Sequence, residues 1–398
     1  MNFIKNNYFN IFIFIFFVSS GLTDVYISIT SIFFLFYIFK NMNNFNYLNK
    51  PFLFSIFFYL SLILSSIISN DITSSLSRSL PYIRFIFFIS FGIYYFNNIN
   101  HKIPINLLNF FLFFLSIDIF FQYIFGFDFF GFESVYEGNF RNSGFFGDEK
   151  IAGSILCDLG MISIVLMKYL KMQFNRKSVF YLLQLIIFIS IIYTGERMAF
   201  IRSLTFITIF YFFYMDNLTI AIKSSFLIIL VFFTFLAISS NENLQMRYKD
   251  IQNKIYTQKS GLVLFDQGHG LLWKSAYKLF LDNPVFGVGT KNFRIDCSQN
   301  FNDESFDKIS EHEKINSICS THPHNYFLEL ISENGLVGLF LFFISIYFFY
   351  ISHVKINYLF LPLLIKLFPF FISGSYFHNY NGILLCFMFI ISTINSKR

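Results

Sequence analysis

Apolar windows of membrane-span length recur along almost the whole sequence, and this repetition constrains the fold more than any other feature. A helix needs about 20 mainly apolar residues to cross the hydrocarbon core of a bilayer. Charged residues make up only 13% of the 398 residues, whereas a soluble domain averages about 25%. We therefore predict an all-α fold, a polytopic transmembrane bundle of about twelve helices. The predicted spans are 8–22, 24–39, 51–69, 79–96, 105–125, 149–167, 178–194, 198–215, 218–239, 325–350, 356–373 and 378–394.

The distribution of Lys and Arg predicts which loops face the cytoplasm. With both termini inside, the cytoplasmic segments carry twelve basic residues and the short outer loops carry four, which follows the positive-inside bias. The segment 240–324 is left out of this count because long domains cross a membrane largely regardless of charge. Its ten basic residues are matched by ten acidic ones, as in a water-facing domain. The predicted domains are N-terminal transmembrane helices at 1–139, central transmembrane helices at 140–239, an external helical loop domain at 240–324 and C-terminal transmembrane helices at 325–398.

The loop domain contains a predicted surface helix that is followed by a glycine turn. Four apolar or aromatic residues recur at helical spacing, which indicates an amphipathic helix near the membrane surface: Trp273, Ala276, Tyr277 and Phe280. Asn283-Pro284 is expected to end this helix, and Gly287 and Gly289 are expected to form a tight turn. Taken alone, this helix and turn are equally consistent with a structural role that braces the loop and with a functional site.

A histidine follows at the predicted boundary between water and membrane. The string is His324-Asn325, nine residues, then Gly335-x-x-Gly338 at the start of an apolar helix. A neutral imidazole takes a proton from a hydroxyl near pH 7, and Asn325 is suited to orient the ring or to cap the helix. The two glycines allow a neighbouring helix to pack closely. A lone interfacial histidine is more often structural than catalytic, so both interpretations stay open at this point.

This string resembles the signature of the O-antigen ligase and polymerase family, in which it closes a large periplasmic loop. Three further blocks are similar to the family in the same order: Phe140–Gly153, Thr194–Arg197 and Trp273–Phe293. The resemblance covers about residues 140–342. It implies a GT-C-like fold in the bacterial inner membrane, an active site on the periplasmic face, and a metal-independent glycosyltransferase that needs no cofactor. The sequence contains no phosphate-binding loop of the nucleotide-binding type.

The resemblance also implies the partners of the chain. The donor is a glycan on undecaprenyl diphosphate, and the acceptor is a hydroxyl of lipid A–core or of another glycan, among membrane lipids and without nucleic acid. Transfer to lipid A–core, as by an O-antigen ligase, is the leading expectation. A polymerase that uses the same donor shares every one of these motifs with a ligase, and protein O-glycosylation is a third option within the family. A transporter or flippase of lipid-linked sugars is the alternative from another class, and it predicts repeat symmetry and broken midplane helices.

Two residues are expected to carry the chemistry that the resemblance implies. His324 is the candidate base, and Arg197 is the candidate ligand of the leaving diphosphate, because a guanidinium stays charged and meets phosphate oxygens bidentately. Arg197 is alternatively an interfacial residue or a partner of Glu196. The candidate substrate-binding residues are Arg141, Arg202, Asn325, His322, His269, Lys274, Arg294 and Glu329.

Several of these assignments have structural alternatives. Arg202 lies within a predicted span, where charge is costly, so it is expected either to bind phosphate or to pair with Asp158 or Asp118. Glu329 either polarises His324 or forms hydrogen bonds within the bundle. Many family members have an arginine where this chain has His269, so another cation is expected to replace it: Lys274, Lys278 or Arg294.

The cysteines divide between the loop domain and the spans. Cys297 and Cys319 both lie in the predicted external domain, where disulfides persist. A bridge between them would stabilise the loop by roughly 3 kcal/mol. Cys157 and Cys386 fall in predicted spans and are expected to be core residues. No ligand spacing typical of a zinc site is present, so no metal is expected.

Overall fold

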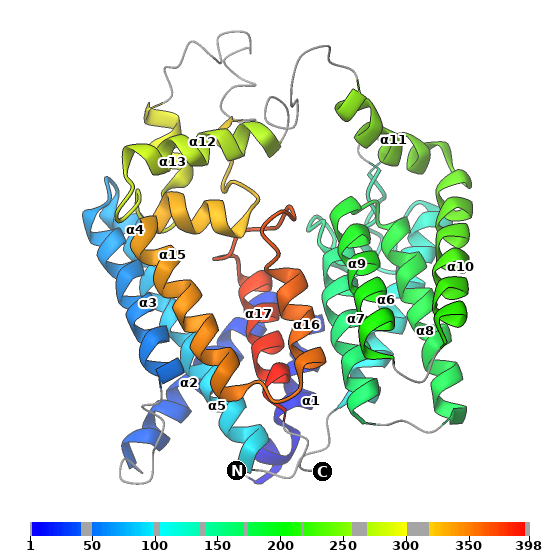
Figure 1. Cartoon of the computed structure of the whole chain (residues 1–398), viewed down its shortest axis with the longest axis horizontal. Helices are drawn as coiled ribbons and strands as arrows, with labels where there is room; N and C mark the ends of the chain where they lie inside the picture. The colour runs from blue at the N-terminus through cyan, green and yellow to red at the C-terminus, as the bar shows by residue number, and fades with distance from the viewer. Residues whose placement is uncertain are drawn as a thin grey trace. The chain divides into compact units, whose positions relative to one another are not determined.

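The computed structural model describes residues 2–40, 50–98, 104–135, 140–170, 174–215, 219–256, 269–300 and 318–394. These residues form helices, and the β-structure among them consists of isolated bridges between Phe127 and Glu133 and between Val135 and Arg141. The all-helical architecture predicted from the hydropathy pattern is thus confirmed for the described part of the chain (Figure 1).

Seven stretches of the described chain are helical, long and apolar enough to cross a membrane, which supports a multi-pass membrane protein. They are α2 (Ser20–Lys40), α3 (Lys50–Ile68), the Ile72–Phe96 stretch, α6 (Ile105–Phe125), α7 (Ala152–Tyr169), α10 (Ile220–Ser239) and α15 (Tyr326–His353). The Ile72–Phe96 stretch comprises α4 (Ile72–Ser79), a 3-10 turn at Leu80–Tyr82 and most of α5 (Ile83–Asn98). Other apolar helices are α1 (Asn2–Val18), α8 (Phe174–Tyr193), α9 (Arg197–Tyr214), α16 (Asn357–Lys366) and α17 (Asn379–Ser392). The count of about twelve spans stays a prediction.

The predicted span 356–373 differs from the helix that forms there. Helix α16 has only 10 residues, and at 1.5 Å per residue it is about 15 Å long. The chain then runs irregularly to His378. Two features explain the early end: Lys366 is buried against Asp158 of α7, and Pro369 disfavours helical geometry in the residue before it. Hydropathy detects neither feature, because the irregular segment is as apolar as a helix.

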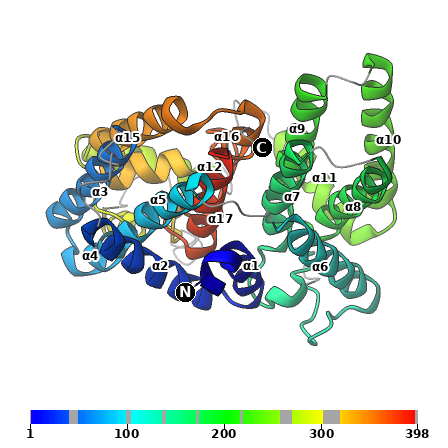
Figure 2. The ribbon, with the colours of Figure 1, turned by 90° about the horizontal axis from the view of Figure 1, so that it is seen from below.

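The chain folds into two compact units, each assembled from segments that are distant in sequence. Unit 1 comprises residues 1–18, 101–259 and 357–366. At its centre lies α7, which packs against α6, α8, α9 and α16, and Figure 2 shows it beside the first three of these helices. Most side chains of α7 are buried, so this helix forms the core of unit 1. The unit also includes α11 (Glu242–Tyr256).

Unit 2 comprises residues 19–100, 260–356 and 367–398. Helix α3 packs along α15, while α5 packs against α2 and α17. Two helices of the predicted loop domain, α12 (His269–Asp282) and α13 (Phe293–Asn300), contact each other and α15 (Figure 1). Residues 257–268 and 301–317 of the predicted loop domain lie outside the described residues. The four-segment domain division and the external placement of 240–324 therefore stay predictions.

The surface helix predicted around Trp273 forms. Helix α12 ends at Asp282, just before Asn283-Pro284 as expected. Its buried stripe is Leu272, Ala276 and Leu279, whereas Tyr277 is exposed. The aromatic stripe of Trp273, Tyr277 and Phe280 is offset by one residue along the sequence from this buried stripe. Both stripes follow the same helical period, so spacing alone did not separate them.

Candidate functional site

The glycine turn after α12 is joined to a break in α15. Gly335 has φ 64° and ψ −167°, a conformation that interrupts the helix. Four main-chain hydrogen bonds join the turn to this break: Val288 N to Ser332 O (3.0 Å), Gly289 N to Glu333 O (2.9 Å), Leu336 N to Pro284 O (2.9 Å) and Val337 N to Val285 O (3.2 Å). Main-chain groups released by the break are thereby paired again, as buried backbone requires. The Asn-Pro-x-x-Gly-x-Gly block and the Gly-x-x-Gly block form a single structural element.

The glycine requirement follows from this contact. A Cβ atom on Gly335 would collide with the Val285 carbonyl, and a Cβ on Gly287 would collide with the main chain at Glu333 and Asn334. Gly335 therefore admits the backbone of a turn, rather than a packed helix as the sequence suggested. Gly338 does lie next to a neighbouring helix, since a Cβ there would be 3.8 Å from Ser61 Oγ of α3.

The backbone of His324 is held in place by hydrogen bonds of its own carbonyl and of the next residue. Its φ is +54°, in the left-handed region that non-glycine residues seldom occupy. The His324 carbonyl accepts a hydrogen bond from Ser373 N at 2.9 Å. The next residue, Asn325, caps α15: its Oδ1 accepts from Phe327 N and Leu328 N at 3.0 and 3.1 Å. Asn325 Nδ2 donates to Pro369 O at 2.6 Å. Of the two roles considered for Asn325, these contacts correspond to the helix cap.

Three of the predicted site histidines come together in unit 2. The ring centroid of His324 lies 4.1 Å from that of His322 and 4.6 Å from that of His269. Burial lowers the pKa of His324, and the nearby Lys291 charge lowers it further, although a Ser373 main-chain hydrogen bond and the Glu329 charge oppose these effects. Burial, followed by the charge of His324, lowers the pKa of His322 to about 2. Both rings are therefore neutral at pH 7, the state in which an imidazole accepts a proton.

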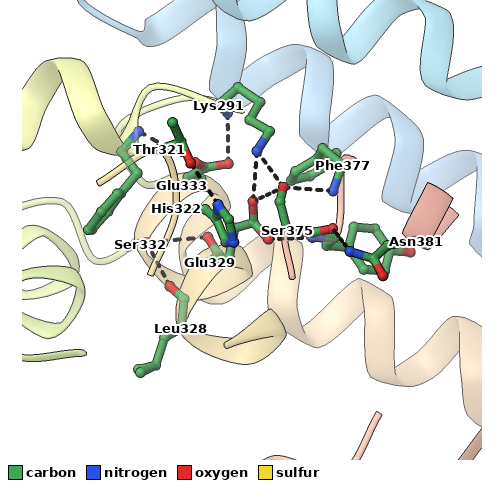
Figure 3. Close-up of polar contacts among 12 residues, drawn as sticks. Lys291, Thr321, His322, Leu328, Glu329, Ser332, Glu333, Ser375, Phe377 and Asn381 are labelled. Atoms are coloured by element: carbon green, nitrogen blue, oxygen red, sulfur yellow. Dashed lines mark hydrogen bonds and ion pairs between the residues drawn. The ribbon is translucent and has the colours of Figure 1, made fainter. Parts of the chain in front are cut away.

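A buried carboxylate network lies beside these histidines (Figure 3). Glu329 Oε1 accepts hydrogen bonds from Ser375 Oγ at 2.5 Å and from Lys291 Nζ at 3.3 Å. Glu329 Oε2 accepts from Tyr376 N at 2.5 Å. Glu333, one turn later in α15, accepts from Lys291 N at 2.7 Å. Glu329 thus hydrogen-bonds within the bundle, and its charge also reaches His324.

The Thr194–Arg197 block in unit 1 is built around a buried glutamate. Glu196 accepts hydrogen bonds from Gly153 N (2.8 Å), Ser154 N (3.0 Å) and Ser154 Oγ (2.7 Å), at the N-terminus of α7. Negative charge is favoured at that end of a helix. A Cβ on Gly153 would lie 2.8 Å from Glu196 Cβ, so only glycine permits this approach. Burial raises the pKa of Glu196, and the charge of Arg141, whose Nη1 is 4.0 Å from Glu196 Oε1, opposes that shift.

Arg197 lies beside a further arginine that the sequence did not single out. Arg197 Nη1 donates to the Arg247 carbonyl at 3.4 Å, and Arg247 Nε donates to the Gly195 carbonyl at 3.3 Å. The charges of Arg141, Arg197 and Arg247 all act on Tyr248, so the three guanidinium groups share one region of unit 1. The burial of Arg247 on an otherwise polar helix is visible only in the structure.

Arg202 pairs with Asp158, one of the two alternatives considered from the sequence. Arg202 Nη1 lies 3.0 Å from Asp158 Oδ1, and Lys366 contacts the other oxygen of the same carboxylate. Arg202 Nη2 also donates to Ser154 Oγ at 3.2 Å. Asp118 instead accepts from the main-chain N–H groups of Phe129 and Phe145. A phosphate bound by Arg202 would have to compete with this ion pair.

The remaining predicted residues lie around α12 and α13. Lys274 and Arg294 are exposed. Cys297 of α13 and Cys319 are paired in a disulfide with a Cα–Cα distance of 5.5 Å, inside an apolar cluster with Leu272 and Leu279. The bridge ties α13 to the segment that leads into His324. Among the described residues, no group of three or more His, Cys, Asp or Glu is arranged to hold a metal ion.

An apolar cavity of about 380 Å³ lies elsewhere in unit 2, between α2, α3, α5, α15 and α17. Tyr82 and Tyr376 line it, and their hydroxyl groups are hydrogen-bonded to each other at 2.5 Å. The main chain of Tyr376 reaches Glu329, so this residue separates the cavity from the carboxylate network. The lining of this cavity is mostly aromatic and aliphatic, which suits a hydrocarbon chain better than a sugar.

A family model described as O-antigen ligase matches residues 182–343. The matched range includes the Thr194–Arg197 block, the helix and turn from Trp273, and the string from His324 to Gly338. The Phe140–Gly153 block lies before it, although Gly153 contacts Glu196 inside it. A search of curated proteins found no match to the chain.

Proposed function

We propose that this chain, which is similar to O-antigen ligase over residues 182–343, is a member of the O-antigen ligase and polymerase family and transfers a glycan from a lipid diphosphate to a sugar hydroxyl. The donor in this proposal is a glycan on undecaprenyl diphosphate, and the acceptor is a hydroxyl of lipid A–core. The observation that carries the proposal is His324, a neutral, half-buried imidazole that is clamped by the Asn325 cap and the Ser373 hydrogen bond.

In the proposed reaction, the acceptor oxygen forms a bond to the anomeric carbon while the bond from that carbon to the diphosphate oxygen breaks. The hydroxyl proton passes to the neutral His324 imidazole, and the electron pair of the broken bond leaves with the diphosphate. Arg197, with Arg141 and Arg247 close to it, is suited to stabilise that leaving charge.

The test is transfer in reconstituted vesicles that contain a glycan on undecaprenyl diphosphate and a lipid A–core acceptor. His324→Gln should lower the turnover by about 10²–10⁴-fold and leave donor binding intact, while Arg197→Gln should weaken both. His353→Gln, at the other end of α15, is the matched control. Wild-type turnover by a correctly inserted His324→Gln protein would refute the proposed mechanism.

The choice of acceptor distinguishes the two family activities. A ligase attaches long chains to lipid A–core, so its deletion should leave free polymer that is not attached to the core. Deletion of a polymerase should instead collapse the ladder of chain lengths on a lipopolysaccharide gel to single repeats. A transporter would move the lipid-linked glycan across the bilayer without a covalent product, and His324→Gln would not slow it.

We further propose that both termini are cytoplasmic and that the site faces the periplasm of the inner membrane. Cysteines introduced at Lys274 and Lys355 distinguish the two sides. A membrane-impermeant maleimide added to whole cells with a permeabilised outer membrane should label the first variant and not the second. Labelling of the second variant alone would reverse the topology.

A further inference from the structure

Lys291 has a backbone conformation that ordinarily favours glycine. Its φ is +65°, and among the described residues His324 is the other non-glycine residue with a positive φ. Side chains are rarely tolerated in this region unless the surrounding structure enforces it, and such residues cluster at functional sites. Glycine would occupy the position without strain. The presence of lysine therefore calls for a role of its side chain.

The contacts of Lys291 show where that side chain is needed. Its Nζ donates to Glu329 Oε1 at 3.3 Å and to Ser375 Oγ, and its main-chain N–H donates to Glu333 Oε2 at 2.7 Å. Figure 3 shows the ammonium group directed toward the Glu329 carboxylate and the Ser375 hydroxyl. An ammonium group has three donors, and these contacts use two of them. The side chain keeps 20% of its surface exposed, which leaves the third donor a path to solvent or substrate.

Lys291 is also the cation that acts on both central histidines. Its charge lowers the pKa of His324 and of His322, in each case after the larger effect of burial. A protonated His324 would be stabilised by the neighbouring Glu329 carboxylate. The ammonium group opposes that effect because it is paired with the same carboxylate.

We infer that Lys291 is a positioning residue of the transferase site, where its strained backbone delivers an ammonium group that balances the Glu329 carboxylate and so keeps the imidazole of His324 neutral. The catalytic consequence rests on the proposed function, because it assumes that His324 acts as the base. Two of the cations expected to replace an arginine at His269, Lys274 and Arg294, are exposed.

The direction of the effect depends on every charged or titratable group that faces His324. These groups are Lys291 from the glycine turn, Glu329 from α15, His269 from α12, and His322 from the same segment. The charge of His378 lowers the pKa of His322, and the Glu333 carboxyl group interacts with the charge of Lys291. Removing the ammonium group leaves Glu329 as the dominant charge. Protonation of His324 then becomes easier, and the neutral base is lost at a higher pH than in the wild type.

The decisive variant is Lys291→Gly, because glycine relieves the backbone strain while it removes the charge. The acid limb of the transfer rate should move up by on the order of one pH unit. The rate should therefore fall about tenfold at pH values below both limbs and match the wild type at alkaline pH. Lys291→Arg should keep the wild-type limb, and Lys249→Gln, at an exposed lysine of α11, is the matched control. The melting temperature of Lys291→Gly should fall below that of the wild type, because relief of the backbone strain offsets only part of the loss of the ammonium partner of buried Glu329.

A second readout does not depend on glycan transfer. Diethyl pyrocarbonate acylates neutral imidazole, and mass spectrometry with fragmentation locates the modified histidine. At pH 6, His324 should be modified more slowly in Lys291→Gly than in the wild type. If this difference appears while the wild type transfers no glycan, the inference stands and the proposed function fails. An unshifted limb, or an equal rate loss at every pH, would overturn the inference even in an active transferase.

Discussion

Replacing Gly335 with alanine should detach the glycine turn from the broken helix α15. The backbone conformation of Gly335, with φ 64° and ψ −167°, is essentially restricted to glycine and would cost an alanine about 1–3 kcal/mol. The added Cβ would also collide with the Val285 carbonyl, which would displace the turn and break the hydrogen bonds from Leu336 N and Val337 N. Each such bond contributes about 1 kcal/mol. The expected loss is therefore about 3–5 kcal/mol of unfolding free energy.

Gly131→Ala is the matched control for this prediction. Gly131 also has a positive φ, +91°, but a Cβ there would meet nothing within 4 Å. Its substitution should cost the backbone term alone, about 1–2 kcal/mol. The two variants should be compared by equilibrium unfolding in mixed micelles and by transfer activity. If both lose the same unfolding free energy, the pairing between the turn and the helix break contributes nothing and the reasoning is wrong.

Three further predictions concern stability. The pKa of His322 falls from about 6.5 in the unfolded chain to about 2 in the folded one, so the unfolded state binds more protons below pH 6.5. Acidification from pH 7 to pH 5 should then lower the unfolding free energy by on the order of 2 kcal/mol, and His322→Gln should flatten that part of a pH-dependent unfolding titration. A Cys297→Ser, Cys319→Ser double variant should lose roughly 3 kcal/mol of loop stability, seen as faster proteolysis near α13, and a reductant should reproduce the effect in the wild type. Asp158→Ala leaves Arg202 and Lys366 buried without their shared carboxylate and should lower the unfolding free energy by about 3–5 kcal/mol. A melting temperature equal to that of the wild type would show that water already solvates Arg202 and Lys366.

Hydropathy predicted most of the helices because membrane spans differ from water-facing segments in composition. It failed where an apolar stretch is not a helix, as at 356–373, since it does not register that Lys366 is anchored to Asp158 or that Pro369 follows. The irregular segment created there supplies Ser373, Ser375 and the main chain of Tyr376 to the histidine and carboxylate network. A sequence window that reads this segment as lipid-facing helix therefore misses part of the candidate site.

The site was predicted best where a motif encodes backbone geometry. The sequence identified Gly287, Gly289 and Gly335 as turn or packing residues. In the structure all three have positive φ, and together they form one contact between two blocks that are 46 or more residues apart in sequence. Lys291 and Arg247 were not singled out, because a basic residue in a loop domain is ordinarily a solvated one. Arg247 differs from a solvated residue by its burial, and Lys291 differs by its backbone strain. Neither property can be predicted from residue type or from spacing along the sequence.

The strained residues of unit 2 share the same supports. Glu333 accepts from the main chain of Lys291, and the Glu333 carbonyl accepts from Gly289, so this residue holds the turn in which Lys291 is strained. Glu329 binds the ammonium group of Lys291 and the Ser375–Tyr376 segment, while Ser373 of the same segment binds the carbonyl of strained His324. Such conformations persist only when their surroundings over-determine them. The two buried glutamates of α15 therefore contribute both to the charge balance around His324 and to the backbone that positions it, which gives these two acidic residues a structural role at the start of an otherwise apolar helix.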